Sequence, residues 1–522
     1  MAVELKSVLV SDAVDPLCVD LLKSHGIEVV CKFKLSKDQL IQELQQHDGL
    51  IVRSDTKVTK EVIDNAPRLR VVGRAGTGVD NIDLDAATKN GVIVINTPGG
   101  NSISACEMTC ALITSLARNV SQACHSLKSG RWDRKLYTGN ELYGKTLAVL
   151  GLGRIGREVA KRMQSYGMRT IGFDPMVNAE DAKAFGVEKM ELDEIWPLAD
   201  YITVHTPLIP QTKNLIGDKA LSKCKKGVCV VNVARGGIVD EEALLRALED
   251  GRCGGAALDV FLEEPPKSEV TLSLIKNPLV VATPHLGAST YEAQQRVAVE
   301  IAEQFVALSM KNKPGENFIV NGAVNAPVLA ATMVASNGPW ITLVERLGRI
   351  LEGVAKTSTA TDLQLTVSGK GLENMKFLNV PLIAGFLHNK MKGKINLINA
   401  PAYGKEAGVN VQFKHEEGEP SIKITLGSHS VSGTLGAGNV PVLLTVNECK
   451  FLPSGVAVGK IIGLFEGLAG QCDLGQILTE IKKQGGDVHS MAAANGSSKV
   501  YIVIQTVNDG IQTINLNGLT IC

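Results

Sequence analysis

An arginine, a glutamate and a histidine each follow an apolar run in the middle of this 522-residue chain. Arg235 ends "CVVNVAR", Glu264 lies in "ALDVFLEEPP", and His285 lies in "VVATPHLGAS". Histidine is the usual proton donor and acceptor near neutral pH. A neighbouring carboxylate favours the protonated imidazole, and the planar fork of arginine binds a carboxylate bidentately. These residue types predict acid–base chemistry on a small anion.

Neighbouring residues leave two alternatives open. Glu263 directly precedes Glu264, and spacing alone does not decide which of them pairs with the histidine. His205, in "YITVHTPL", is a second histidine at the end of an apolar run, and we interpret it as packing beside a cofactor rather than as the base. Gly236 and Gly237, which follow the arginine, would let the backbone turn close to the ligands.

A glycine-rich motif lies upstream of these residues, in "TLAVLGLGRIGREVAKRM". Its G-x-G-x-x-G spacing directly follows an apolar run and opens a helical stretch, which is the context that the dinucleotide-binding fingerprint requires. An aspartate ends the next apolar run, about 20 residues further on, where a carboxylate binds the ribose hydroxyls and repels a 2′-phosphate. The pattern predicts NAD rather than NADP, and hydride transfer coupled to proton transfer. The candidate cofactor-binding residues are Gly151, Gly153, Arg154, Ile155, Gly156 and Asp174.

These residues need elements that bring the ends of several apolar runs together. Over the first hundred or so residues, runs such as "SVLVSD", "IEVVC" and "GLIVRS" alternate with helical stretches such as "DPLCVDLLKSHG". A long helix, "SISACEMTCALITSLARN", follows, and the alternation begins again at Gly144. This order predicts an α/β fold with two doubly wound parallel sheets. In such sheets ligands bind outside the carboxyl ends of the strands, where the candidate side chains lie.

The composition narrows the class of protein further. The chain has 54 basic and 54 acidic residues, so no overall charge attracts nucleic acid or an anionic membrane. No apolar stretch is long enough for a spanning helix, and "MAVELKSVLVSD" lacks the pattern of a secretory signal. Eleven cysteines indicate reduced thiols in the cytoplasm. We interpret Cys106 and Cys110, one helical turn apart, as buried side chains, and we expect no metal site.

On several motifs together, the sequence resembles the D-isomer-specific 2-hydroxyacid dehydrogenases. The motifs are "LGLGRIGREVAKRMQSYGM", "HTPL" with "CKKGVCVVNVARGGIVDEEAL", and "GAALDVFLEEPP" with "PHLGAST". The resemblance extends from residue 1 to about residue 310 and is weaker beyond it. It implies NAD-dependent oxidation of 3-phosphoglycerate to 3-phosphohydroxypyruvate, the first step of phosphorylated L-serine biosynthesis, by a cytoplasmic homodimer or homotetramer.

The resemblance assigns roles to further positions. "LIVRSDTKVT" and "VVGRAGTGVDNIDL" look like parts of the substrate domain of the members that act on a phosphorylated acid, and they imply that Arg53 and Arg74 bind its anionic groups. More than one arginine suits a substrate with two anionic ends. Arg134, in "GRWDRKLYTG", would reach the active site of a neighbouring subunit. The NAD site would include Thr77, Thr206, Pro207, Ala234, Asp259 and Gly287.

The segment "KNKPGENFIVNGAVNAP" has the composition of a linker. We predict a discontinuous substrate-binding domain, flavodoxin-like, over 1–98 and 286–312, and a Rossmann-type NAD-binding domain over 99–285. An α+β intervening domain (313–440) and a degenerate ACT-like regulatory domain (441–522) would follow. In the last of these, "GKIIGLFEGLAGQ" and "GGDVHSMAAANGSSKVYIVIQ" predict a helix followed by two strands. The effector-binding Asp-x-Pro-Gly turn of ACT domains is missing, and "ECKFLPSG" is a poor substitute, which weakens the expectation of inhibition by serine.

Two alternative functions remain at this point. The chain could be another 2-hydroxyacid dehydrogenase, such as a glyoxylate or hydroxypyruvate reductase, which the long tail and the paired arginines disfavour. It could also be a binding protein, because corepressors that sense NADH share this fold and the three catalytic side chains. Turnover of a phosphorylated acid distinguishes the enzyme from the sensor.

Overall fold

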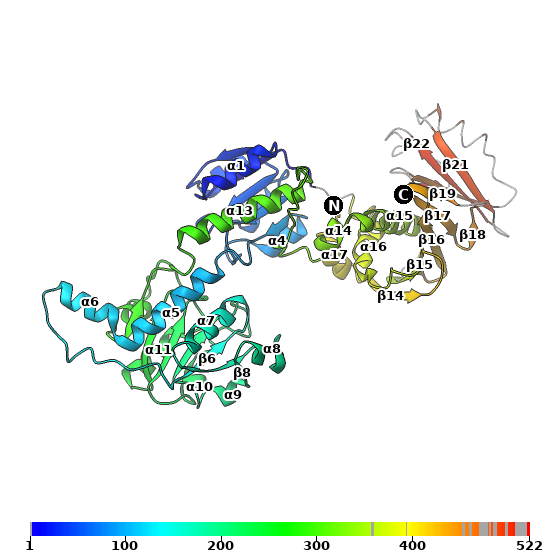
Figure 1. Cartoon of the computed structure of the whole chain (residues 1–522). Coiled ribbons are helices and arrows are strands. Elements are labelled where there is room, and N and C mark those ends of the chain that lie inside the picture. Colours follow the sequence, from blue (N-terminus) through cyan, green and yellow to red (C-terminus); the bar gives the residue numbers. More distant parts are fainter. Residues whose placement is uncertain are drawn as a thin grey trace.

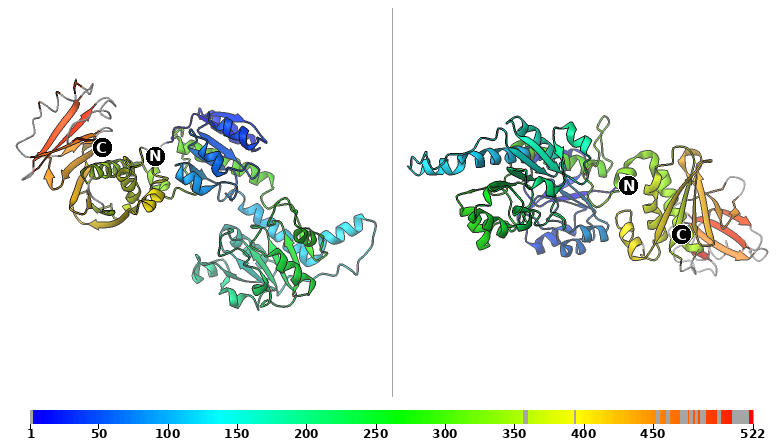
Figure 2. Two further views of the ribbon diagram at one scale, coloured as in Figure 1. Left: turned by 180° about the vertical axis from the view of Figure 1, so that it is seen from behind. Right: turned by 90° about the horizontal axis from the view of Figure 1, so that it is seen from below.

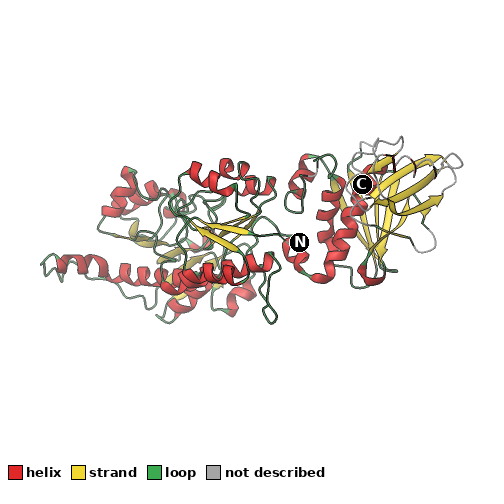
Figure 3. Ribbon diagram, turned by 90° about the horizontal axis from the view of Figure 1, so that it is seen from above, coloured by secondary structure: helices red, strands yellow, loops and turns green. Residues whose placement is uncertain are grey.

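Figure 1 shows a computed structural model of the chain. It describes residues 3–355, 360–392 and 394–451, and beyond them 455–458, 462–468, 475, 479, 482–483, 488–495, 499–506 and 519–521. Within these residues, no helix combines the length and the apolar character needed to cross a membrane. Helices and strands alternate in the first two domains, whereas strands predominate toward the end of the tail (Figure 3).

The first α/β domain is built on a five-stranded sheet in which neighbouring strands are parallel. The strand order β2-β1-β3-β4-β5 is the flavodoxin-like doubly wound order. Three of its helices begin at a side-chain cap, because Asp15, Ser36 and Asp83 each accept a backbone N–H from the first turn. The strands are β1 (Ser7–Val10), β2 (Glu28–Cys31), β3 (Gly49–Val52), β4 (Val71–Arg74) and β5 (Ile93–Ile95), and the helices are α1 (Pro16–Ser24), α2 (Lys37–Leu44), α3 (Lys60–Asp64) and α4 (Leu84–Lys89).

The second α/β domain is built on a seven-stranded sheet, again with parallel neighbours, in the order β12-β11-β10-β9-β6-β7-β8. The order reverses between β6 and β9, which creates the switch point where Rossmann folds bind a dinucleotide. The two sheets confirm the predicted α/β fold class. The strands are β6 (Thr146–Leu150), β7 (Arg169–Phe173), β8 (Glu188–Lys189), β9 (Tyr201–Val204), β10 (Val228–Asn232), β11 (Cys253–Leu258) and β12 (Val280–Ala282). The helices are α7 (Arg154–Gln164), α8 (Ala179–Ala184), α9 (Leu192–Ile195), α10 (Asp218–Leu221), α11 (Glu241–Glu249) and α12 (Glu269–Lys276).

The chain crosses between the two domains twice. It leaves the first domain before α5, and it returns in α13, whose apolar face joins the core of the first domain beside α1. The crossings are bonded to each other, since Arg296 Nε donates to the Gly100 carbonyl (3.0 Å) and the hydroxyls of Ser104 and Thr290 lie 2.7 Å apart. The connecting helices are α5 (Ser102–Arg118), α6 (Val120–Lys128) and α13 (Tyr291–Leu308).

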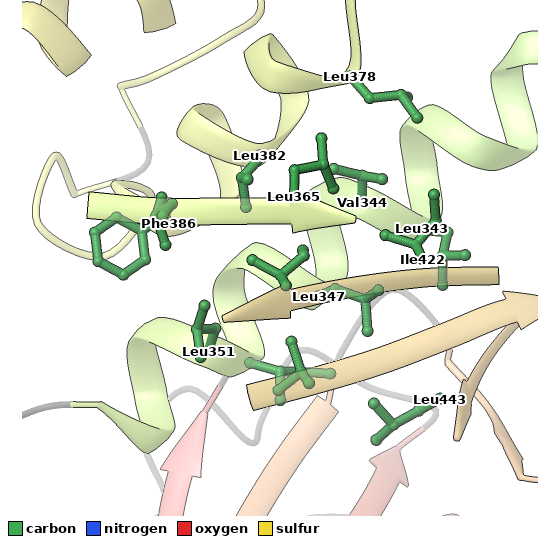
Figure 4. Close-up of a cluster of buried hydrophobic side chains, with 14 of the residues drawn as sticks. Leu343, Val344, Leu347, Leu351, Leu365, Leu378, Leu382, Phe386, Ile422 and Leu443 are labelled. Atoms are coloured by element: carbon green, nitrogen blue, oxygen red, sulfur yellow. The ribbon is translucent and has the colours of Figure 1, made fainter. Parts of the chain in front are cut away.

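A mixed sheet covered by helices forms the first part of the tail, on the side of the first domain away from the second (Figures 1 and 2). Its strand order is β14-β13-β15-β16-β17-β18, and β19 pairs with β17. Leu343, Leu347 and Leu351 of α15 pack among Leu365 and Ile422 of the sheet (Figure 4). The elements are α14 (Leu329–Met333), α15 (Gly338–Val354), β13 (Asp362–Ser368), α16 (Asn379–Phe386), α17 (Ala400–Glu406), β14 (Asn410–Glu416), β15 (Ser421–Leu426), β16 (His429–Leu435), β17 (Pro441–Val446), β18 (Cys449–Lys450) and β19 (Val456–Ala457).

The end of the tail differs from the prediction in two places. The boundary predicted between residues 440 and 441 falls inside the mixed sheet, because β17 pairs with β16. The prediction of a helix over the segment "GKIIGLFEGLAGQ" is wrong, because Ile462–Leu468 of this segment form the strand β20. Two glycines weaken a helix there, and β20 is instead paired on both edges, with β22 (Lys499–Thr506) and β23 (Leu519–Ile521).

The two strands predicted after that segment are present as β21 (Val488–Asn495) and β22. The four-stranded sheet has the order β21-β22-β20-β23. Other parts of the predicted terminal domain, including residues 452–454 of "ECKFLPSG", lie outside the described residues.

Candidate active site

Glu264 and His285 form a direct pair at the carboxyl end of the second sheet. Glu264 Oε2 lies 2.7 Å from His285 Nδ1, and Glu264 Oε1 accepts from the Phe261 amide (3.1 Å). Burial would raise the pKa of the Glu264 carboxyl, but the hydrogen bonds from His285 and Phe261 outweigh it and hold that pKa below its ordinary value. Glu263 pairs instead with Lys267 (3.1 Å). The geometry thus brings together the acid–base pair expected from the sequence, with Glu264 as the carboxylate.

A buried aspartate shapes the loop that presents the histidine. Asp259 follows β11 and is fully buried. One carboxylate oxygen accepts from the Thr283 hydroxyl (2.6 Å) and the Leu286 amide (2.7 Å), and the other accepts from the Gly287 amide (2.8 Å). His285 adopts a left-handed backbone conformation (φ 54°), which is uncommon for a residue other than glycine. Asp259 was expected beside NAD, and its contacts in the chain show it organising the histidine loop.

Arg235 reaches from β10 across to the first domain. Its Nε donates to Asp80 Oδ2 (3.0 Å), and its Nη1 donates to the Ala234 carbonyl (2.7 Å). A Cβ atom on Gly78 would lie 2.0 Å from Arg235 Nη2, so a side chain at residue 78 would displace the guanidinium from this place. The arginine that ends a buried strand therefore spans the space between the two domains.

Arg53 and Arg74 lie at the carboxyl ends of neighbouring strands of the first sheet. The Nε atom of each is buried and has no hydrogen-bond partner within the described residues. Arg74 Nη1 donates to the Gly78 carbonyl. Burial lowers the pKa of Arg74 to about 10, and the nearby charges of Arg235 and Arg53 act in the same direction. Three cations thus gather at one place with donors to spare, which suits a ligand with more than one anionic group.

Two residues that the sequence analysis did not single out hold the Arg53 loop. Asp12, a buried residue after β1, accepts from the backbone amides of Arg53 (2.6 Å) and Thr56 (3.1 Å) and from the Thr56 hydroxyl (2.6 Å). Asn81 Nδ2 donates to the carbonyls of Arg53 and Thr56, each at 2.7 Å. Asp80, the partner of Arg235, was missed as well. The available signal was position, because all three follow strands of a doubly wound sheet at the end where ligands bind.

The glycine motif forms the strand–turn–helix that the sequence predicted. Gly151 follows β6 with φ 97°, in the left-handed region that favours glycine. A Cβ atom on Gly156 would lie 2.0 Å from the Gly151 carbonyl oxygen, so glycine is what allows α7 to approach the turn. No atom lies within 4 Å of a Cβ placed on Gly153, and this open backbone at a helix N-terminus suits a pyrophosphate.

The surroundings of the motif fit NAD. Asp174, at the end of β7, accepts from the amides of Leu152 and Met176, each at 2.8 Å, which places its carboxylate beside the glycine turn. The Thr206 hydroxyl, after β9, is buried without a hydrogen-bond partner among the described residues. His205 bonds to the Thr203 hydroxyl (3.0 Å), and burial lowers its pKa to about 3. A neutral, half-buried His205 agrees with its interpretation as packing.

The remaining predicted positions divide into those at the site and one away from it. Thr77 donates to Asn101 Oδ1 (2.6 Å) and Arg154 Nη1 donates to the Pro98 carbonyl (3.1 Å), so both contact the first crossing between the domains. Arg134 is exposed on the loop after α6, which projects from the second domain (Figure 1). The chain does not bring it to its own site. Ile155, Pro207 and Ala234 lie at the ends of elements that meet at the switch point.

Comparison with known families agrees with this geometry. Residues 110–287 match the D-isomer specific 2-hydroxyacid dehydrogenase NAD binding domain. Residues 337–447 match the D-3-phosphoglycerate dehydrogenase intervening domain. Among solved structures, a D-lactate dehydrogenase from Aquifex aeolicus complexed with NAD and lactic acid is 28% identical, with a TM-score of 0.53 over 61% of this chain and 100% of the other. A glyoxylate reductase from Paecilomyes thermophila is 27% identical, with a TM-score of 0.54 over 61% of this chain and 98% of the other.

Relatives of similar length are closer. The D-3-phosphoglycerate dehydrogenase of Homo sapiens is 50% identical over 460 residues, which are 86% of this chain and 84% of the relative. That of Bacillus subtilis is 43% identical over 412 residues, which are 78% of this chain and 76% of the relative. The proteins that share most of this chain's length are thus named as D-3-phosphoglycerate dehydrogenases. The chain belongs to the D-3-phosphoglycerate dehydrogenases, within the D-isomer specific 2-hydroxyacid dehydrogenase family.

Proposed function

We propose that the chain oxidises 3-phosphoglycerate to 3-phosphohydroxypyruvate with NAD, at the start of phosphorylated serine synthesis. The observation that carries this proposal is the meeting of Arg53, Arg74 and Arg235 on the first domain's side of the Glu264–His285 pair. A phosphorylated 2-hydroxyacid has a carboxylate and a phosphate, and these match the donors of a three-arginine cluster. A substrate with a single carboxylate leaves part of the cluster unpaired.

His285 is the acid–base group in this proposal. Its Nδ1 is bonded to Glu264, which leaves Nε2 to take the proton of the substrate hydroxyl. The ionised Glu264 stabilises the imidazolium that forms and fixes the ring. Arg235 holds the substrate carboxylate. When bound, NAD accepts the hydride from the substrate carbon. Gly151, Gly153 and Gly156 with the α7 N-terminus would hold its pyrophosphate, and Asp174 its ribose.

Substrate comparison tests the proposal. NADH absorbance is followed with 3-phosphohydroxypyruvate, hydroxypyruvate, glyoxylate and pyruvate as separate substrates. We expect rapid oxidation only with the phosphorylated acid, and Arg74→Gln should remove that preference. A preference for an unphosphorylated acid would make the chain a different 2-hydroxyacid dehydrogenase. Tight NADH binding without turnover of any acid would instead support the sensor alternative.

We also infer a homodimer or homotetramer that joins through the projecting arm. Around α6 the arm exposes Leu127 (57%), Trp132 (80%) and Leu136 (71%), and several large exposed apolar side chains on one segment suit an interface. Arg134 lies between the last two, where it would enter the partner's site. The double variant Trp132→Ser/Leu136→Ser should be a monomer by light scattering. The control Phe33→Ser, which changes an exposed aromatic residue of the first domain, should keep the native size.

The sheets of the tail suggest how it divides into domains. We propose that the intervening domain extends through β19 and that the sheet β21-β22-β20-β23 is a degenerate ACT-like domain.

Two buried thiols, Cys18 and Cys253, have pKa values that burial raises to about 12 and about 11. The nine cysteines among the described residues are all free, and free thiols are typical of a reducing compartment such as the cytoplasm, where we propose that the enzyme works.

A further inference from the structure

Asp80 occupies one edge of the guanidinium that the reaction needs. The Arg235–Asp80 bond joins residues of different domains, and it uses Nε, the donor nearest the side-chain stem. Nη1 also donates to the Ala234 carbonyl. An arginine has five N–H donors, so three N–H groups on Nη1 and Nη2 remain available. Because Nε is already used, a substrate carboxylate that binds Arg235 through two N–H groups must bind Nη1 and Nη2 rather than the edge that contains Nε.

The loop that carries Asp80 is held in place from several sides. Asn81, the next residue, bonds to the Arg53 loop through its side chain, and its carbonyl accepts from the Val58 amide (2.8 Å). Thr77 is tied to Asn101 at the start of α5. A carboxylate on a fixed loop can define the direction of a long, otherwise mobile arginine side chain.

Stability does not account for the ion pair. The side chains of Arg235 and Asp80 are 30% and 62% exposed, and ion pairs at such sites contribute little to folding. A negative charge beside an anion-binding cluster also opposes the binding of an anion. The orientation that Asp80 gives to the Arg235 guanidinium can compensate for this cost.

We propose that Asp80 is a positioning residue: it holds the Arg235 side chain between the two domains, with Nη1 and Nη2 turned to the substrate carboxylate. The inference rests on the proposed function of Arg235 as the carboxylate-binding group. Because Asp80 fixes the fork in advance, binding of the substrate need not order it. Asp80 itself stays on the far edge of the guanidinium and does not contact the substrate.

The variants Asp80→Ala and Asp80→Asn test the proposal, with Asp85→Asn as a control in the exposed first turn of α4. We expect Asp80→Ala to raise the KM for 3-phosphohydroxypyruvate roughly 10-fold or more, with a much smaller change in kcat. Asp80→Asn should recover part of the loss, because its amide oxygen still accepts from Nε. NADH binding, measured by fluorescence, should be unchanged in all three.

Two inhibitors separate the carboxylate subsite from the phosphate subsite. Binding of oxalate to the NADH complex, measured by calorimetry, should weaken in Asp80→Ala, whereas binding of inorganic phosphate should not. An unchanged KM would overturn the proposal, and so would a lower one, because Asp80 would then compete with the substrate. Oxalate binding needs no turnover, so a wild-type chain that turned over no phosphorylated acid would refute the proposed function and leave this inference testable.

Discussion

The contact between Glu264 and His285 makes Glu264 the residue whose loss is most informative. Glu264→Gln keeps a hydrogen-bond acceptor but removes the charge that stabilises the imidazolium. We expect kcat to fall on the order of 100-fold, with little change in NADH affinity. Steady-state kinetics with 3-phosphohydroxypyruvate measures both. The neighbouring variant Glu263→Gln is the matched control and should remain active, since Glu263 bonds to Lys267; equal losses in the two variants would contradict the assignment.

The Glu264–His285 pair also affects how the activity depends on pH in the acid range. The folded-state pKa of Glu264 is lowered, so its favourable interaction is present above the ordinary glutamate pKa and is lost as the pH falls through the lowered value. We therefore expect wild-type activity to show no titration of Glu264 near the ordinary glutamate pKa of about 4.3. A pH–rate profile at saturating substrate, taken into the acid range where the protein stays folded, checks this. A step near the ordinary value would show that the pair does not form in the working enzyme.

The sequence indicated single candidate residues of the site but few of the contacts that hold them. Arg235, Asp174 and His285 were identifiable because each ends an apolar run, and a parallel sheet brings such ends together. The Asp80–Arg235 bond joins residues far apart in the chain and across two domains, and no local pattern indicates it. Arg134 illustrates the opposite limit, since its predicted role needs a second chain.

At the scale of elements, the turn between β6 and α7 depends on two glycines for different reasons. Gly156→Ala places a methyl group against the Gly151 carbonyl, which is backbone and cannot move aside. We expect a loss of roughly 1–3 kcal/mol in the free energy of unfolding, even without NAD. Gly153→Ala meets no atom in the chain, so it should unfold like the wild type and yet bind NADH weakly, because its methyl group would point to the cofactor.

Thermal or denaturant unfolding without ligand, combined with NADH fluorescence, separates the two effects. If Gly156→Ala were as stable as the wild type, the close approach of α7 to the turn would be wrong. If Gly153→Ala bound NADH normally, the pyrophosphate would not lie over that residue. The pair of variants therefore tests the packing of the element and its use independently.

The elements themselves were predictable where the pattern is local. Caps such as Ser36 and Asp83, and the run of residues before the Gly151 turn, define helix and strand ends within a few residues of sequence. β20 was not predictable in this way, because its short apolar stretch is also compatible with a helix. It forms a strand because it pairs with two strands that are distant in the sequence, β22 and β23. The continuation of the mixed sheet into β17 is likewise set by pairing with β16 rather than by any change in composition at residue 440.

At the scale of the whole molecule, the tail is attached to the first α/β domain. Side chains around α17 bond to backbone carbonyls at the end of α4: Asn399 Nδ2 to Lys89 (3.3 Å), Tyr403 Oη to Lys89 (3.3 Å) and Asn396 Nδ2 to Gly91 (3.1 Å). α4 begins directly after the loop that carries Asp80. A change in how the intervening domain sits can therefore reach Asp80, and through it Arg235, by way of one short helix.

Tyr403→Phe and Asn399→Ala, alone and combined, test whether these bonds hold the tail in place. Asn399 is buried and also bonds within its own domain, so Asn399→Ala should cost roughly 1–3 kcal/mol, whereas Tyr403→Phe removes only the bond to Lys89. We expect the double variant to show faster proteolysis of the linker at 312–325 and a larger radius of gyration in solution scattering, with the catalytic trio intact. Asn389→Ala, which loses a bond to Glu352 inside the intervening domain, is the control. Unchanged proteolysis and scattering in the double variant would mean that other contacts, such as the hydrogen bonds of Asn325 to Val92 and Val94, fix the tail against the first domain.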